Sequence, residues 1–61
     1  MAPEAMLTLE EVAKLLQVNP YTVTRYCLKG DLEYVRLGHR TLRFKPRWVD
    51  EFIERKQRRA S

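Results

Sequence analysis

The side chains best suited to chemistry gather in one short stretch near the middle of the chain, where Tyr21, Thr22, Thr24 and Arg25 lie within five residues. Arginine can grip a guanine edge or a phosphate, threonine can bond a base or touch a thymine methyl, and tyrosine can reach backbone oxygens. This combination indicates recognition of a DNA groove. The competing interpretation is an ordinary solvated helix face, so the surrounding elements have to decide between the two.

Residues for catalysis or for metal binding do not form any set in this sequence. The chain has a single cysteine, Cys27, and a single histidine, His39, so it can form neither an internal disulfide nor a zinc site of the usual kind. There is no serine, histidine and acid candidate and no Gly-rich phosphate loop. We therefore expect no enzyme activity, no cofactor and no metal.

Local chemistry predicts that the central stretch is a helix at residues 20–29. Asn19 is a favourable N-cap, Pro20 suits the first helical position, and Gly30 can adopt the left-handed conformation that ends a helix. At 100° per residue the helix has two faces. The packing face is formed by Val23, Tyr26 and Cys27. The outer face is formed by Tyr21, Arg25 and Leu28, flanked by Thr22, Thr24 and Lys29.

A second helix, at residues 8–17, is predicted directly before it. Thr8 and Glu11 form a capping-box pattern, and an apolar stripe follows at helical spacing. The stripe consists of Leu9, Val12, Ala13 and Leu16. Only three residues, 17–19, separate the two helices, and Val18 can fill the corner between them. The pair is therefore predicted to be a helix-turn-helix, whose second helix reads DNA.

The segment after Gly30 changes to a period of two, which predicts a hairpin with strands at residues 34–37 and 41–44. A two-residue turn at Gly38-His39 would pair Val35 with Leu42. A three-residue loop would instead set Val35 against Arg43, unless a bulge corrected it. With the two-residue turn, the inner face consists of Val35, Leu37, Leu42 and Phe44. The outer face then consists of Tyr34, Arg36, Thr41 and Arg43.

The last element is predicted to be a helix at residues 46–58. Its apolar stripe consists of Trp48, Val49, Phe52 and Ile53. Of these, Trp48 and Phe52 are expected to be the main core anchors. Residues 1–7 and 59–61 are expected to be flexible ends of one domain that spans residues 1–61. The expected fold class is mainly α with a small β-hairpin.

Charge distribution favours a polyanionic partner. The formal net charge is +4, and residues 21–48 carry seven basic residues against two acidic ones, whereas residues 1–20 have net charge −2. The excess therefore coincides with the predicted reader helix and the hairpin, whose tip carries His39 and Arg40. There is no apolar run long enough to span a membrane and no signal-peptide pattern, so we expect a cytoplasmic protein without a membrane partner.

The ordered series of motifs resembles the excisionase/MerR-like winged-helix DNA-binding domains. The matching segments are Leu7 to Val23, Lys29 to Leu32, Val35 to Arg40 and Phe44 to Pro46. The resemblance implies a winged helix-turn-helix in which Tyr21, Thr22, Thr24 and Arg25 lie in the major groove and Arg40 contacts DNA from the wing. Members often have Gly where this chain has Gln17.

The full candidate DNA-binding set combines the outer face of the reader helix with the wing. It consists of Pro20, Tyr21, Thr22, Thr24, Arg25, Lys29, Arg36, His39, Arg40 and Arg43. For His39, a solvated turn residue is the simpler interpretation, because one histidine supports no further role. Arg40 could enter a narrow minor groove, where negative potential is concentrated.

Within this family, domains of this size are similar to phage excisionases, also called recombination directionality factors. The resemblance implies that the protein binds and bends double-stranded DNA beside an attachment site in a bacterial host and contacts integrase. Together with the charge split between the acidic first helix and the basic wing or tail, it predicts that copies assemble head to tail on DNA. In free solution we expect a monomer, because no heptad repeat remains for a dimer seam. A small MerR-like transcription regulator and a protein-interaction adaptor remain the alternatives.

Overall fold

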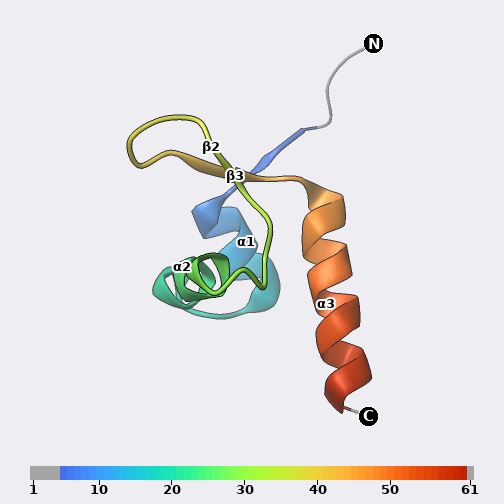
Figure 1. The fold of residues 1–61 in the computed structure, drawn as a ribbon. Helices are drawn as coiled ribbons and strands as arrows, with labels where there is room; N and C mark the ends of the chain where they lie inside the picture. The colour runs from blue at the N-terminus through green and yellow to red at the C-terminus, as the bar shows by residue number, and fades with distance from the viewer. Residues whose placement is uncertain (1–4, 61) are drawn as a thin grey trace.

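The computed structural model describes residues 5–60, with side chains to residue 57. In chain order its elements are β1 (Leu7–Thr8), α1 (Leu9–Leu16), α2 (Pro20–Leu28), β2 (Val35–Arg36), β3 (Leu42–Phe44) and α3 (Pro46–Ala60). Figure 1 shows α1 and α2 below a small antiparallel sheet, with α3 alongside as the closing helix. The predicted winged helix-turn-helix, mainly α with a β wing, is confirmed.

Side-chain caps fix where the first two helices begin. Thr8 N donates to Glu11 Oε1 at 2.8 Å, and Glu11 N donates to Thr8 Oγ1 at 3.1 Å, so the predicted capping box is present. Asn19 Oδ1 accepts a hydrogen bond from Tyr21 N at 2.8 Å, and Gly30 follows α2 with φ of 82°. These caps set the start of α1 and both ends of α2 within one residue of the predicted bounds.

The turn between α1 and α2 depends on an unusual backbone conformation at Gln17. This residue caps the C-terminus of α1 with φ of 58° and ψ of 45°, in the left-handed region that favours glycine. The next residue, Val18, donates its N–H to Ala13 O at 2.9 Å and packs against the core. The predicted role of Val18 in the corner is thus confirmed, and Gln17 occupies a conformation that glycine adopts more readily.

A third strand joins the hairpin. β1 pairs with β3, and the strand order is β1-β3-β2. Leu7 lies opposite Phe44, and Thr8 opposite Arg43. The prediction that residues 1–7 are flexible is therefore wrong at Leu7, because two residues are too few to show a period of two in the sequence. Residues 1–4 and 61 of the expected flexible ends lie outside the described residues, whereas residues 59 and 60 lie in α3.

The predicted hairpin register is wrong by one residue. Val35 pairs with Arg43 and Arg36 with Leu42, and Leu37 N donates to Thr41 O at 2.8 Å, so the loop contains three residues, 38–40. A type II′ turn at Gly38 would need a positive φ, which this glycine does not have. The alternative three-residue loop is therefore the one that forms, without a correcting bulge.

This register changes which residues share a face of the sheet, because directly opposed residues point to the same side. Leu42 and Phe44 face the core as predicted, and Arg36 joins their side. Arg43 points to the opposite side, together with Val35. Leu37, predicted to be an inner residue, is 61% exposed. A strand of only two residues buries too little apolar surface to enforce the predicted pattern.

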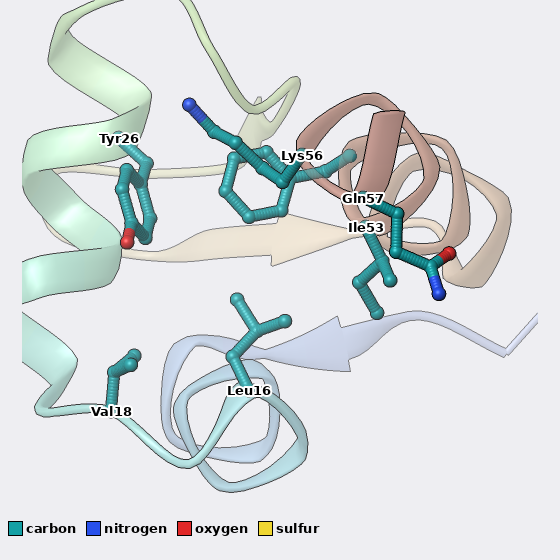
Figure 2. A pocket seen from close by; sticks show the side chains of 7 residues that line it. Leu16, Val18, Tyr26, Ile53, Lys56 and Gln57 are labelled. Carbon is teal, nitrogen blue, oxygen red and sulfur yellow. The ribbon is translucent and has the colours of Figure 1, made fainter. Parts of the chain in front are cut away.

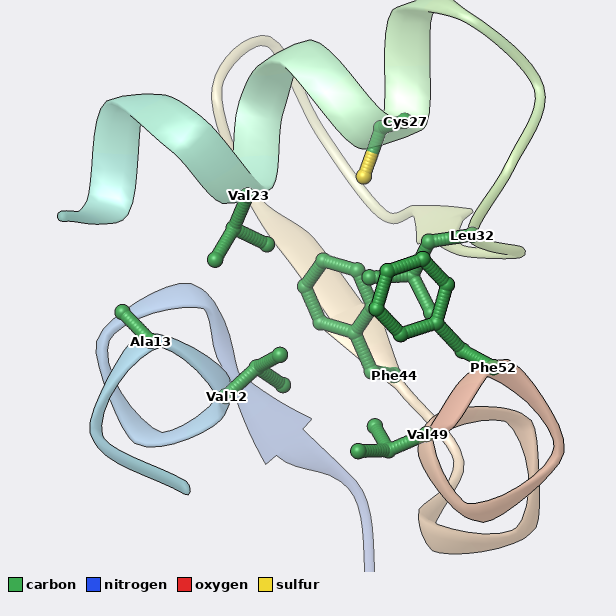
Figure 3. Close-up of a cluster of buried hydrophobic side chains, with 8 residues drawn as sticks. All are labelled: Val12, Ala13, Val23, Cys27, Leu32, Phe44, Val49 and Phe52. Atoms are coloured by element: carbon green, nitrogen blue, oxygen red, sulfur yellow. The ribbon is translucent and has the colours of Figure 1, made fainter. Parts of the chain in front are cut away.

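The hydrophobic core lies between α1, α2, the sheet and α3, as Figure 3 shows. Its fully buried side chains include Phe44 and Leu32, which are 0% and 1% exposed. The remaining buried members are Val12, Ala13, Val23, Cys27, Val49 and Phe52. The prediction for Phe52 is confirmed, whereas that for Trp48 is wrong, since Trp48 is only half-buried and its ring lies 5.4 Å from Lys45 Nζ.

Helix α3 is held against the end of α2 by polar as well as aromatic contacts. Lys56 Nζ lies 3.6 Å from Asp31 Oδ2, and the Arg55 guanidinium donates to the Asp31 carbonyl. The rings of Tyr26 and Phe52 are 4.9 Å apart. The loop after α2, and hence the orientation of α2, is therefore fixed by α3. Every helix within residues 5–60 is too short or too polar to cross a membrane.

Candidate nucleic-acid interface

Helix α2 presents the two faces expected from its sequence. Val23 and Cys27 are buried in the core, whereas Tyr21 is 70% and Leu28 is 78% exposed. Arg25 is exposed on the same outer side. The core contacts of one face thus fix the direction in which the other face projects, so that an aromatic ring and a guanidinium stand clear of the protein body.

The first turn of α2 adds an electrostatic feature to this face. Pro20 at the first helical position and Tyr21 are both exposed, and no acidic residue lies in this turn. The first turn has no free N–H to offer, because Pro20 lacks one and the Tyr21 N–H donates to Asn19 Oδ1, but the helix dipole still makes this terminus attractive to an anion. An approaching phosphate would therefore meet no repulsion from the first turn of this helix.

The two threonines of the candidate set are less available than Tyr21 and Arg25. Thr22 and Thr24 are half-buried, and Thr24 Oγ1 donates to Pro20 O at 3.3 Å. The Thr24 hydroxyl hydrogen is therefore committed to the helix backbone, although the oxygen can still accept a bond and the methyl can still touch a base. Lys29 forms the C-cap of α2 and is exposed.

The wing carries basic residues on its tip and on both faces. His39 and Arg40 lie in the loop between β2 and β3 and are exposed. Arg36 and Arg43, predicted to share one face, lie on opposite faces because of the observed register. The Arg43 guanidinium also donates to Leu42 O at 2.8 Å. Arg43 is therefore the wing arginine least free to reach a ligand.

Helix α2 and the wing project on the same side of the molecule. In Figure 1 both extend to the left, and α3 lies on the right. Their proximity is established by a groove of about 170 Å³ that residues from both elements line. The lining residues are Thr24, Cys27, Leu28, Tyr34, Arg36 and Leu42. The structure thus places the reader helix and the wing side by side.

Sequence reasoning missed two of these groove residues, Leu28 as a contact and Tyr34. Neither has a distinctive local pattern, and their placement beside Arg36 depends on the three-residue loop. Cys27 forms part of the floor, and burial raises the pKa of its thiol. The thiol therefore stays protonated at neutral pH, in agreement with the predicted role of Cys27 as a small buried residue.

A separate apolar groove lies between the helix-turn-helix corner and α3. Figure 2 shows Leu16, Val18 and Tyr26 lining it from the side of the helix-turn-helix, and Ile53, Lys56 and Gln57 from the side of α3. The Lys56 ammonium is occupied by Asp31 and by the rings of Tyr26 and Phe52. This groove therefore has little free positive charge for a polyanion.

Within the described chain, no three His, Cys, Asp or Glu side chains could hold a metal ion together.

Comparison with known proteins gives one match. A family model described as a helix-turn-helix domain matches residues 6–57, which include both helices of the corner, the wing and most of α3. Among curated proteins and solved structures, none matches the chain.

Proposed function

This chain belongs to the helix-turn-helix domain family, and on that premise we propose that it is an excisionase, an architectural protein that sets the direction of integrase-mediated recombination. Helix-turn-helix domains bind double-stranded DNA with their second helix in the major groove. The chain is therefore a DNA-binding domain. Its use in recombination is the proposed part, supported by the resemblance of its ordered motifs to excisionases.

The observation that carries the proposal is the placement of α2 and the basic wing on one side of the molecule. With α2 in a major groove, the wing tip with Arg40 would reach the adjacent minor groove. The exposed outer face of α2 would supply Tyr21 and Arg25 for base and backbone contacts. Arg36, His39 and Lys29 would add contacts to the backbone, which position the protein.

Several copies on neighbouring sites would give this small module a secure hold on DNA. One module of this kind buries only about 600–1,000 Å² of protein surface. The first helix, with Glu10 and Glu11 exposed, would complement the basic wing or tail of another copy, and such a head-to-tail contact would continue along DNA without closing. Bending each short site would cost about 1–6 kcal/mol.

We propose that the protein is a monomer until DNA brings copies together. Sedimentation of the free protein at micromolar concentration should give the mass of one chain. The same measurement with a DNA of repeated sites should give successive complexes. A stable dimer without DNA would contradict this part of the proposal.

Recombination itself tests the proposed function. The purified protein is added to a reconstituted reaction that contains the integrase encoded beside its gene and the attachment-site DNA of that integrase. The salt concentration of the reaction matches that of the bacterial host's cytoplasm. Excision should rise and integration should fall. The Arg25→Ala variant should lose both effects, and Arg47→Ala should retain them, because Arg47 is an exposed arginine at the start of α3 outside the candidate set.

The alternative is a small MerR-like transcription regulator, which would use the same interface on DNA. It would leave both recombination directions unchanged and would alter transcription from an adjacent promoter. A protein-interaction adaptor would change neither, and would not retard duplex DNA in a mobility assay.

A further inference from the structure

We propose that the groove between α2 and the wing is a seat for one phosphodiester of the DNA strand that separates the major groove from the neighbouring minor groove. Arg36 and Tyr34 would hold the phosphate, and Leu28 would pack against the adjoining deoxyribose. This inference rests on the proposed docking of α2 and the wing on DNA. It adds a contact site that lies between the two elements.

The shape of the groove suits a small group on an extended chain. Its volume of about 170 Å³ is below the roughly 300–1,000 Å³ typical of small-molecule pockets. One wall comes from α2 with Thr24 and Leu28, and the other from the wing with Tyr34 and Arg36. A module that enters adjacent major and minor grooves must straddle the single backbone strand between them, so this strand faces the groove.

The observed strand register is what points Arg36 into this groove. Arg36 lies opposite Leu42, and both share the face of the sheet that Phe44 turns toward the core. Arg43 lies opposite Val35 on the other face and is bonded to Leu42 O. The chain thus provides two arginines on one wing, of which only Arg36 lines the groove.

The groove holds free donors for an anion. Among residues 5–57, none forms a hydrogen bond or an ion pair with the side chain of Arg36 or of Tyr34. Thr24 already donates to Pro20 O, and the Cys27 thiol is protonated, so neither supplies a negative charge or a competing anion. Glu33 precedes Tyr34 in the chain but does not line the groove.

Charge and exposure favour the DNA backbone as the occupant. The guanidinium at the groove complements a phosphate, and the surrounding segment 21–48 has seven basic residues against two acidic ones. Leu28 is 78% exposed at the edge of the groove, where a deoxyribose would cover it. An acidic peptide would match the charge of the groove. It would not explain why the groove lies between the two elements proposed to enter adjacent DNA grooves, where a DNA backbone strand runs.

The test combines protein variants with single neutral phosphates. A duplex site is first selected from random DNA with the wild-type protein, and each phosphate is then replaced in turn by a methylphosphonate. One position between the α2 and wing contacts should weaken wild-type binding about tenfold. Arg36→Gln should bind unmodified DNA about tenfold more weakly and should reduce the magnitude of the slope of log K against log salt concentration by about 0.9. The methylphosphonate at that one position should then cause no further loss of affinity.

Two further variants sharpen the result. Arg43→Gln removes the same charge from the other face of the wing and should keep the full loss at the modified phosphate. Tyr34→Phe removes one hydroxyl and should weaken binding to unmodified DNA severalfold. On DNA with the methylphosphonate at the proposed position, the same substitution should weaken binding less. Circular dichroism should show that all three variants are folded, since each side chain is at the surface or half-buried.

Two results would overturn the inference. In the first, the affinity loss caused by Arg36→Gln and the loss caused by a methylphosphonate multiply at every phosphate position. This would show that Arg36 contacts no single phosphate. In the second, Arg36→Gln and Arg43→Gln lose the same affinity on unmodified and on modified DNA, which would show a general charge effect. If the wild type still binds duplex DNA, either result contradicts only the phosphate contact and not DNA binding. If the wild type binds no duplex at all, both proposals are wrong.

Discussion

Arg25 and Arg40 are exposed guanidinium groups on elements that should enter different DNA grooves. Arg25 projects from the outer face of α2, where a bidentate bond to guanine can discriminate bases by about 1–3 kcal/mol. Arg40 lies at the wing tip, where contact with a minor groove or phosphate is mainly electrostatic. We expect Arg25→Ala to narrow the affinity gap between selected and random duplex, and Arg40→Ala to lower both affinities together.

Competition binding at fixed salt measures these two effects. Arg47→Ala serves as the charge-matched control and should leave both affinities nearly unchanged. Equal, sequence-independent losses for Arg25→Ala and Arg40→Ala would remove Arg25 from base readout.

The residue that anchors the core was only partly predictable. Phe52 and Val23 follow from helical periodicity, and both are buried. Leu32 and Phe44 were harder to rank, because each lies in a short irregular or two-sided segment whose burial depends on how α3 closes. The prediction that Trp48 anchors the core is wrong because size alone does not bury a ring, and at the first turn of α3 this ring remains half-exposed.

Truncation of Phe44 should therefore damage the fold much more than truncation of Trp48. Phe44→Ala removes a fully buried ring and should cost about 3–5 kcal/mol, close to the whole stability of a domain this small. Trp48→Ala should cost about 1–2 kcal/mol. Urea unfolding followed by circular dichroism would compare them, and a larger cost for Trp48→Ala would contradict the described core.

At the scale of elements, the helix-turn-helix corner carries backbone strain at Gln17. A non-glycine residue in the left-handed region, such as Gln17, destabilises the folded state by about 1–2 kcal/mol. Glycine avoids this strain, but its greater freedom in the unfolded chain destabilises the folded state by about 0.5–1 kcal/mol. Gln17→Gly should thus stabilise the domain by about 0.5–1 kcal/mol. For a domain of this length the midpoint of thermal unfolding should rise by about 2–8 °C.

Gln17→Ala is the matched control, because alanine removes the same side chain while keeping the strain. Its midpoint should stay near that of the wild type or fall. A rise as large as that of Gln17→Gly would show that the gain comes from the side chain and not from the backbone.

Helices were predicted more accurately than strands, for a physical reason. Caps at Thr8, Asn19 and Gly30 are local interactions, and each is present where the sequence indicated. Strand pairing depends on partners far apart in the chain, so β1 went undetected and the wing register was shifted. That shift moved Arg36 and Arg43 to opposite faces, which the sequence pattern alone could not reveal.

At the scale of the whole molecule, charge and shape act together. The acidic first helix and the basic segment 21–48 divide the molecule electrostatically, and the fold places α2 and the wing of that basic segment on one side. The candidate residues are thereby gathered on a common side even though the sequence assigned them to separate elements. What the fold adds is the groove between these elements, which no single motif encodes.

The salt dependence of duplex binding tests this account most directly. A basic surface that contacts about four to six phosphates releases their counterions, so log K plotted against log salt concentration should have a slope of about −4 to −5. The measurement is a titration of a fluorescent duplex with the wild-type protein at several salt concentrations. A slope in that range is the result we predict, and a slope near zero would show that the side formed by α2 and the wing does not face DNA.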